Sequence, residues 1–176
     1  QRTLVFSLLA EGRRLKLLES PDSHNFRFVH DSVREALLEN LEPEQKSGWH
    51  RLAAHALTQP TETFARAEHF WASIPHGELD QEVCLANFEA GRLALAGQAP
   101  QEAHDYFLRA IACRPLDLEL GADFEEGFGD ACFLTGGLQQ AREHYERALL
   151  FRQEPVQRAD LWRRIGLVYA LDLRSE

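Results

Sequence analysis

Apolar and small residues recur along the second half of the chain in blocks whose glycines lie 38 and 37 positions apart. Each block carries a small or apolar residue followed by glycine, with further key positions three and four residues away, which is the spacing of one helix face. A repeat of this length indicates stacked pairs of helices. The blocks are Asn87-x-x-Ala90-Gly91-x-x-Ala94, Glu125-x-x-Phe128-Gly129-x-x-Cys132 and Trp162-x-x-Ile165-Gly166-x-x-Tyr169.

A second helix is expected after each of the first two blocks. Pro100 can open one at its first position, Pro115 ends it, and Gly136-Gly137 supplies the next turn. Small residues on both helices of a pair let the backbones approach closely, so each pair should form a helical hairpin. The third copy is cut short. The residues with helical spacing on the second helices are Ala103, Phe107 and Ala110, then Ala141, Tyr145 and Ala148.

The first 43 residues follow a different pattern. Residues 4–9 indicate the end of a helix, and residues 14–18 and 25–30 indicate two short strands around a turn cluster at Ser20–Ser23. The second of these segments alternates polar and apolar residues, which is typical of a strand. The sequence therefore predicts a β-hairpin here.

Two helices should follow this hairpin. Asp31 or Ser32 is expected to cap the first, with Glu35 completing a capping box. Pro43 opens the second, over residues 44–57. One face of that helix carries Trp49, Leu52, Ala53 and Ala56.

The predicted fold is mainly α: an array of helical hairpins, or α-solenoid, with a small β-hairpin near the start. Three regions are expected. They are residues 1–43, residues 44–80 as a degenerate helical hairpin, and residues 81–176 as the repeats.

The repeats resemble the tetratricopeptide repeat, which has Trp, Leu-Gly and Tyr on its first helix and Ala, Phe, Ala and Pro on its second. The third block matches the first half of that pattern, and the second helix of the first copy matches the other half. Asn87 and Glu125 depart from it, because Trp is usual at their position. The spacing also exceeds the family's usual 34 residues.

The upstream half resembles the end of the winged-helix region of large bacterial signal-transduction ATPases, the multidomain type related to the maltose-regulon activator. The resemblance lies in Phe28-x-His30-Asp31-x-x-Arg34-Glu35-Ala36, in Leu41-Glu42-Pro43 with Trp49-His50-Arg51-Leu52-Ala53, and in Ala67-Glu68-His69-Phe70-Trp71. It implies that residues 1–43 are the C-terminal part of a winged-helix-like region, and that a nucleotide-binding core belongs upstream. This chain has no Gly-x-x-x-x-Gly-Lys phosphate loop, so it should not bind or hydrolyse ATP.

Composition narrows the class of protein. The net charge of −9 argues against nucleic-acid binding by this chain, and no apolar run approaches the roughly 18 residues of a membrane span. Cys84, Cys113 and Cys132 are expected to be buried reduced thiols in a cytoplasmic protein. The chain has no Met and starts at Gln1 inside an apolar stretch, so we expect it to be cut from a larger protein.

No residue pattern indicates catalysis. The eight histidines lack the spacing of a metal site, so we expect no cofactor, no metal and no enzymatic activity. The run Glu119, Asp123, Glu125, Glu126 and Asp130 fits a solvated helix face. Phe124, Phe128 and Phe133 fit a core.

A protein-binding site is the better candidate. In such repeats the first helices line a concave face, and this face is the expected site. By the family register it carries Leu85, Phe88, Arg92 and Leu95, then Asp123, Glu126, Asp130 and Phe133, then Arg163, Leu167 and Leu171. Its middle is acidic, so a basic or amphipathic peptide, or another domain of the parent chain, could bind there. Alternatively, the face only aids solubility or packs on missing domains.

Two functions remain open at this stage. The chain is a regulatory, protein-interaction arm of a signal-transduction ATPase or transcriptional regulator, or it is a free-standing scaffold or adaptor that binds a basic segment. The sequence does not decide the oligomeric state.

Overall fold

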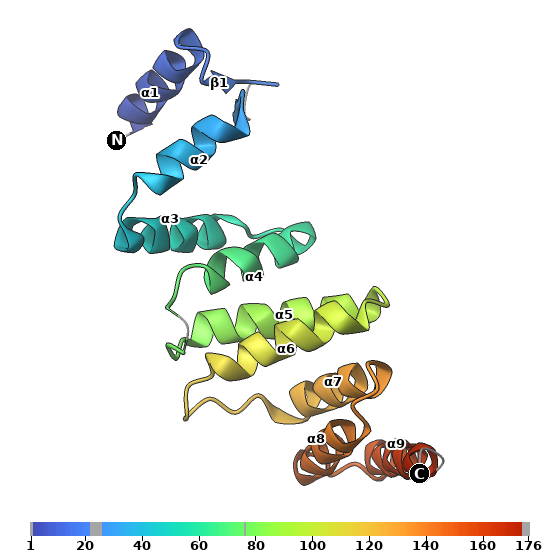
Figure 1. The fold of residues 1–176 in the computed structure, drawn as a ribbon. Helices are drawn as coiled ribbons and strands as arrows, with labels where there is room; N and C mark the ends of the chain where they lie inside the picture. Colours follow the sequence, from blue (N-terminus) through green and yellow to red (C-terminus); the bar gives the residue numbers. More distant parts are fainter. Residues whose placement is uncertain (1, 22–25, 76, 174–176) are drawn as a thin grey trace. The chain divides into compact units, whose positions relative to one another are not determined.

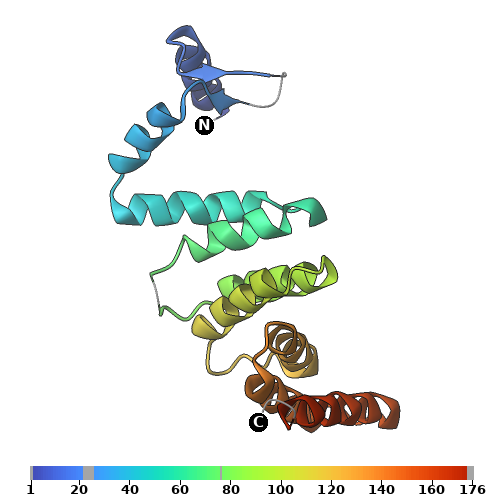
Figure 2. The same ribbon diagram turned by 45° about the vertical axis from the view of Figure 1, so that its right-hand side comes forward.

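The computed structural model describes residues 2–21, 26–75 and 77–173 (Figures 1 and 2). The chain divides into two compact units, Gln1–Lys46 and Ser47–Glu176. It is mainly helical, with a small two-stranded antiparallel sheet. Among the described residues, none of the helices combines the length and apolar character needed to span a bilayer.

The first unit contains the predicted β-hairpin. Its strands pair in antiparallel register, Leu18 with Phe28 and Glu19 with Arg27. The predicted turn cluster lies partly at residues 22–25, outside the described residues. The elements are α1 (Arg2–Arg14), β1 (Leu18–Glu19), β2 (Arg27–Phe28) and α2 (Asp31–Glu39). The helix before the hairpin thus extends to Arg14, and the first strand starts later than predicted.

The capping box expected at the start of α2 is wrong. His30 is the N-cap residue, in an extended conformation, and its side chain makes no capping hydrogen bond. Ser32 and Glu35 lie inside the helix, where neither can act as the capping residue that the box requires.

The second unit is built from helices that pack in sequence order. They are α3 (Pro43–Ala56), which starts in the first unit, the 3-10 turn η1 (Pro60–Glu62), α4 (Thr63–Trp71), α5 (Gln81–Ala96), α6 (Pro100–Ala112), α7 (Gly121–Leu134), α8 (Leu138–Phe151) and α9 (Pro155–Asp172). α5 packs on α6 and α7 on α8, as the repeat pattern predicts (Figure 1). The predicted helix start at Pro100 and the turn at Gly136-Gly137 are confirmed, and Gly136 has a φ of 88°, which favours glycine.

Small side chains form much of the core between paired helices. Seven alanines at these contacts are 0–3% exposed: Ala90, Ala94, Ala103, Ala110, Ala131, Ala141 and Ala148. Larger rings fill the space between the alanines, chiefly Phe107, Phe124, Phe128 and Tyr145. Phe107 packs edge-on against Phe124, with ring centroids 5.5 Å apart.

Polar contacts join α3 to α4 and α5. The Nδ1 atoms of His50 and His69 lie 2.9 Å apart, and Arg51 donates to Asp80 at 2.7 Å. The face predicted for α3 is not the one it packs with, because Trp49 and Leu52 are exposed and the buried residue is Ala54.

Candidate protein-interaction surface

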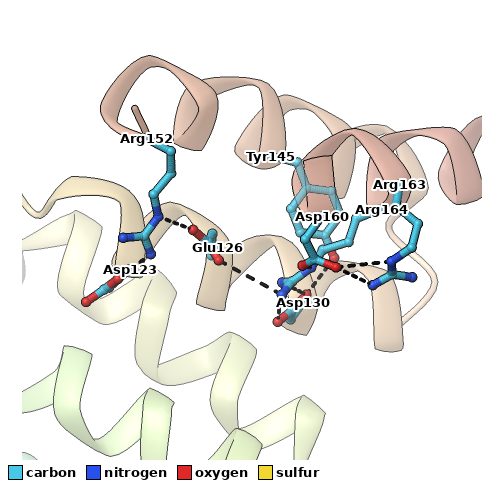
Figure 3. A network of polar contacts seen from close by, with 8 residues as sticks. All are labelled: Asp123, Glu126, Asp130, Tyr145, Arg152, Asp160, Arg163 and Arg164. Atoms are coloured by element: carbon cyan, nitrogen blue, oxygen red, sulfur yellow. Dashed lines mark hydrogen bonds and ion pairs between the residues drawn. The ribbon is translucent and has the colours of Figure 1, made fainter. Parts of the chain in front are cut away.

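The three carboxylates predicted to line the concave face, Asp123, Glu126 and Asp130, all lie on α7 (Figure 3). Their spacings of three and four residues place them on one side of the helix. The structure shows that each already has a cationic partner within the chain.

Arg152, directly after α8, holds the first two carboxylates. Its Nε lies 2.6 Å from Glu126 Oε1 and its Nη2 lies 2.5 Å from Asp123 Oδ1. Hydrogen bonding to Glu126, with a smaller contribution from Asp123, keeps the pKa of Arg152 above its usual value although partial burial opposes this. Arg152 therefore bridges two turns of α7.

Arg164 on α9 holds the third carboxylate. Its Nη1 donates to both oxygens of Asp130, at 2.8 and 2.9 Å. Tyr145 on α8 donates its hydroxyl to the same carboxylate at 2.8 Å. Burial, reinforced by the neighbouring Asp130 charge, raises the pKa of Tyr145, so its hydroxyl remains a donor at neutral pH.

Asp160 completes the network on α9. It accepts from Arg164 Nε at 2.8 Å and from Arg163 Nη2 at 2.8 Å. The hydrogen bond from Arg163 is the main cause that lowers the pKa of Asp160. The network thus joins four carboxylates to three guanidinium groups and is close to electrically neutral.

A small pocket of about 250 Å³ opens beside Asp130. Its other lining residues come from α7, α8 and α9: Phe133, Tyr145, Arg163, Arg164 and Leu167. We call Asp123, Glu126, Asp130, the pocket and its lining residues the α7–α9 face. The structure brings four predicted residues, Asp130, Phe133, Arg163 and Leu167, together around this pocket.

The predicted residues on α5 lie apart from it. Phe88 is half-buried, and its ring packs edge-on against Phe124 at 5.5 Å, so it belongs to the core. Arg92 is exposed and paired with Glu89 on its own helix at 3.2 Å. Phe88 and Arg92 do not line the pocket beside Asp130, and Leu85 lines a separate pocket with Ala86 and Glu89.

One part of the solvated-face prediction is wrong. Glu125 is buried, and its Oε2 lies 2.7 Å from His144 Nδ1. Arg147 lies 3.4 Å from the same oxygen. The carboxylate points into the hairpin because position 125 falls on the side of α7 that packs against α8. Phe124 and Phe128 are core residues as predicted, and Phe133 is half-buried against the core.

A larger apolar groove of about 890 Å³ in the second unit was not predicted from the sequence. The rings of Phe64 and Tyr106 stack along it with centroids 5.8 Å apart, and Leu93 also lines it. The lining residues with polar side chains are Thr61, Glu102 and Tyr106. No periodic pattern marks it, since its walls come from η1, α4, α5 and α6.

The described residues bring no three histidine, cysteine, aspartate or glutamate side chains into a metal-binding group. No family model matches the chain, and no curated protein sequence matches it either.

Proposed function

We propose that the chain is a protein-interaction and regulatory arm made of tetratricopeptide-like hairpins, with the α7–α9 face as its binding surface. The assignment of a structural repeat is supported by one contact that occurs in both hairpins. A side chain added at Gly91 would meet the ring of Phe107 on α6, and one added at Gly129 would meet the ring of Tyr145 on α8. The same contact thus recurs one repeat later.

The observation that carries the function is a pocket lined by the exposed Arg163, on a face that also carries the exposed, oppositely charged Asp123 two turns before Asp130 on α7. Asp123 is 69% exposed and Arg163 is 66% exposed, and Figure 3 shows them at opposite ends of the ion-pair network. The pocket, which Arg163 itself lines, offers the rings of Phe133 and Tyr145 together with Leu167. It has room for one apolar side chain.

The partner proposed for this face is an extended segment of mixed charge. A basic side chain would meet the exposed side of Asp123, next to Arg152, and an apolar side chain would enter the pocket. An acidic side chain would meet the exposed guanidinium of Arg163, next to Asp160. A purely basic segment is less well matched, because Arg152 and Arg164 already neutralise Glu126 and Asp130.

The proposed setting is a bacterial signal-transduction ATPase whose nucleotide-binding core lies outside this chain. The α1–α2 region supports this setting through its small hairpin followed by a helix, the order expected at the end of a winged-helix region. A free-standing scaffold would use the same face for a segment of another protein.

The test uses overlapping 15-residue peptides that cover the rest of the parent protein, titrated against the chain by fluorescence anisotropy. We expect at least one peptide whose affinity falls tenfold or more in both Asp123→Lys and Arg163→Glu. Arg114→Glu, an exposed charge reversal outside the face, is the matched control and should leave the affinity unchanged. If Asp123→Lys and Arg163→Glu both bind every peptide with wild-type affinity, the proposed surface is refuted. Binding only to peptides from other proteins would favour the scaffold.

A further inference from the structure

The apolar groove beside Phe64 and Tyr106 lies where one pair of helices meets the next. α4 has 9 residues and packs on α5, which has 16, so α4 cannot cover the whole of that helix (Figure 1). The chain before α4 forms the single turn η1, and its Pro60 and Thr61 form another wall. Every lining residue falls within positions 60–106, and the chain folds into further helices on both sides of this segment.

Aromatic and aliphatic side chains line most of the groove and remain accessible. The rings of Phe64 and Tyr106 stack with centroids 5.8 Å apart, and Phe64 and Leu93 are 40% and 41% exposed. The rest of the lining is mostly alanine, glycine and proline. A space of about 890 Å³ with an apolar lining and few polar groups is typical of sites for small organic molecules.

Glu102 is the one charged side chain among the described residues that line the groove. It is exposed in the first turn of α6, where the helix N-terminus favours a carboxylate. No basic side chain in the described part of the chain forms an ion pair with it. Glu68, the other carboxylate that acts on Tyr106, is already paired with Arg109 at 2.6 Å. Glu102 therefore leaves one unpaired negative charge at the apolar groove.

The ionisation of Tyr106 is affected by the same charge. Burial is the main cause that raises the pKa of Tyr106 to about 12, and the charge and hydrogen bond of Glu68 add to it. Arg109 opposes this rise, and Glu102 adds to it. The hydroxyl is thus protonated at neutral pH, and the field of Glu102 reaches the wall of the groove.

We propose that this groove is a binding site for a small organic cation, a molecule with an aromatic or aliphatic body and one ammonium group. The body would lie against Phe64 and Leu93, and the ammonium group would pair with Glu102. A cation is costly to bring into apolar surroundings unless a counter-charge meets it. The accessible ring of Phe64 adds a further attraction for the cation.

A peptide segment is less well matched to this groove. Each buried peptide group needs a partner for its N–H and its C=O, and an apolar lining offers few. The inference is independent of the proposed function, because the groove shares no residue with the α7–α9 face.

The experiment compares three probes that share one apolar body and differ in charge: naphthylethylamine, naphthylethanol and naphthylpropanoate. Their affinities for the chain are measured by NMR chemical-shift titration at neutral pH. Glu102→Gln removes the charge, and Phe64→Ala removes the ring. Glu44→Gln is the matched control, because Glu44 is an exposed carboxylate in the first turn of α3 and does not line the groove.

We expect the amine to bind at least tenfold more tightly than the alcohol, and the carboxylate to bind more weakly still. Glu102→Gln should reduce the affinity for the amine to that for the alcohol, and Phe64→Ala should weaken the binding of both. Glu44→Gln should leave the affinity for the amine within twofold of wild type.

Three results would overturn the proposal: no binding of the amine, equal affinities for the three probes, or an unchanged affinity for the amine in Glu102→Gln. A capped Trp-Ala-Lys tripeptide, which carries an ammonium group and a ring on a peptide backbone, adds one more outcome. We expect it to bind at least fivefold more weakly than the amine. Binding as tight as that of the amine would assign the groove to a protein segment and would also overturn the proposal.

Discussion

Gly129 lies against the ring of Tyr145, so closely that a Cβ at position 129 would be 2.6 Å from Cε1 and 2.7 Å from Cδ1 of the ring. Tyr145 cannot easily move away, because its hydroxyl donates to Asp130 at 2.8 Å and the ring is buried. The glycine and the tyrosine therefore fix the separation of α7 and α8.

Gly129→Leu should destabilise the second unit by about 1–3 kcal/mol, the usual cost of overpacking a core contact. Chemical denaturation followed by circular dichroism measures the free energy of unfolding. Gly166→Ala is the matched control, since the added methyl group meets nothing within 4 Å. It should stabilise the chain by roughly 0.5–1 kcal/mol through helix propensity. Equal effects of the two substitutions would contradict this packing.

Replacing Asp123, Glu126 and Asp130 together with lysine should destabilise the chain by about 1–3 kcal/mol. The helix spacing alone suggests freely exposed carboxylates. The side chains of Arg152 and Arg164, however, are about three-quarters buried. In the triple variant they would lose their carboxylate partners and lie next to new positive charges. Asp123→Lys alone should change the free energy of unfolding by less than about 0.5 kcal/mol, because Asp123 is largely exposed. A triple variant as stable as wild type would show that the network does not contribute to stability.

Asp80 should link stability to acid pH. Burial opposes its ionisation, but hydrogen bonds from Arg51 and the Val83 backbone outweigh this and hold the pKa of Asp80 below its usual value. A lowered carboxyl pKa contributes stability above the unfolded-state pKa of about 4, and this contribution is lost as the pH falls through the folded-state value.

Two substitutions at Asp80 separate its roles as a charge and as the N-cap of α5, where its Oδ1 accepts from Val83 N at 3.0 Å. Asp80→Ala removes both and should cost about 1–2 kcal/mol at neutral pH. Asp80→Asn keeps an acceptor for the cap, so it should cost less and should weaken the loss of stability below pH 4. The free energy of unfolding is measured by urea titration at several pH values. If Asp80→Asn loses as much stability below pH 4 as the wild type does, the charge of Asp80 does not link stability to pH.

Phe28→Ala should loosen the β1–β2 hairpin. Phe28 is half-buried and pairs with Leu18, so its truncation should cost about 1–2 kcal/mol, below the roughly 3–5 kcal/mol of a fully buried Phe. Hydrogen exchange at the Val29 amide, which donates to Leu17 O at 3.0 Å, reports on this hairpin. Arg27→Ala, at an exposed position on the same strand, should leave that protection nearly unchanged.

Calorimetric titration with Mg-ATP should give no binding by this chain, because it contains no phosphate loop. The nucleotide site of the proposed parent protein would lie elsewhere. Micromolar affinity for Mg-ATP would contradict the expected absence of a nucleotide site. It would also contradict the proposal that the nucleotide-binding core of the parent protein lies outside this chain.

The helical hairpins were predictable because their signals are local. The glycines at positions 91 and 129, the alanines of α6 and α8 and the breaks at Pro100 and Gly136 all act within a few residues of their place in the sequence. The packing face of α3 was predicted wrongly because it depends on contacts that are not local. Trp49 and Leu52 share one side of the helix, but which side meets α4 depends on contacts made by His50 and Arg51 with distant residues.

The candidate face was predictable only in part. Asp123, Glu126 and Asp130 follow from helix spacing, whereas their partners do not. Arg152 lies 29 and 26 positions from the first two carboxylates, and Arg164 lies 34 positions from Asp130. Such pairs form only once α8 and α9 pack against α7. The residues that look like an acidic run in the sequence therefore belong to a nearly neutral network in the folded chain.

The alanines between the paired helices have a consequence for the thermodynamics of folding. Alanine has no rotamers to lose, so burying it carries almost no side-chain entropy cost, unlike burying leucine, methionine or a long charged residue. The interfaces built on Ala90, Ala103, Ala131 and Ala141 therefore need less apolar area to be stable than interfaces of flexible side chains. Each hairpin can close tightly with a thin core, and most of the ordering cost falls on the backbone.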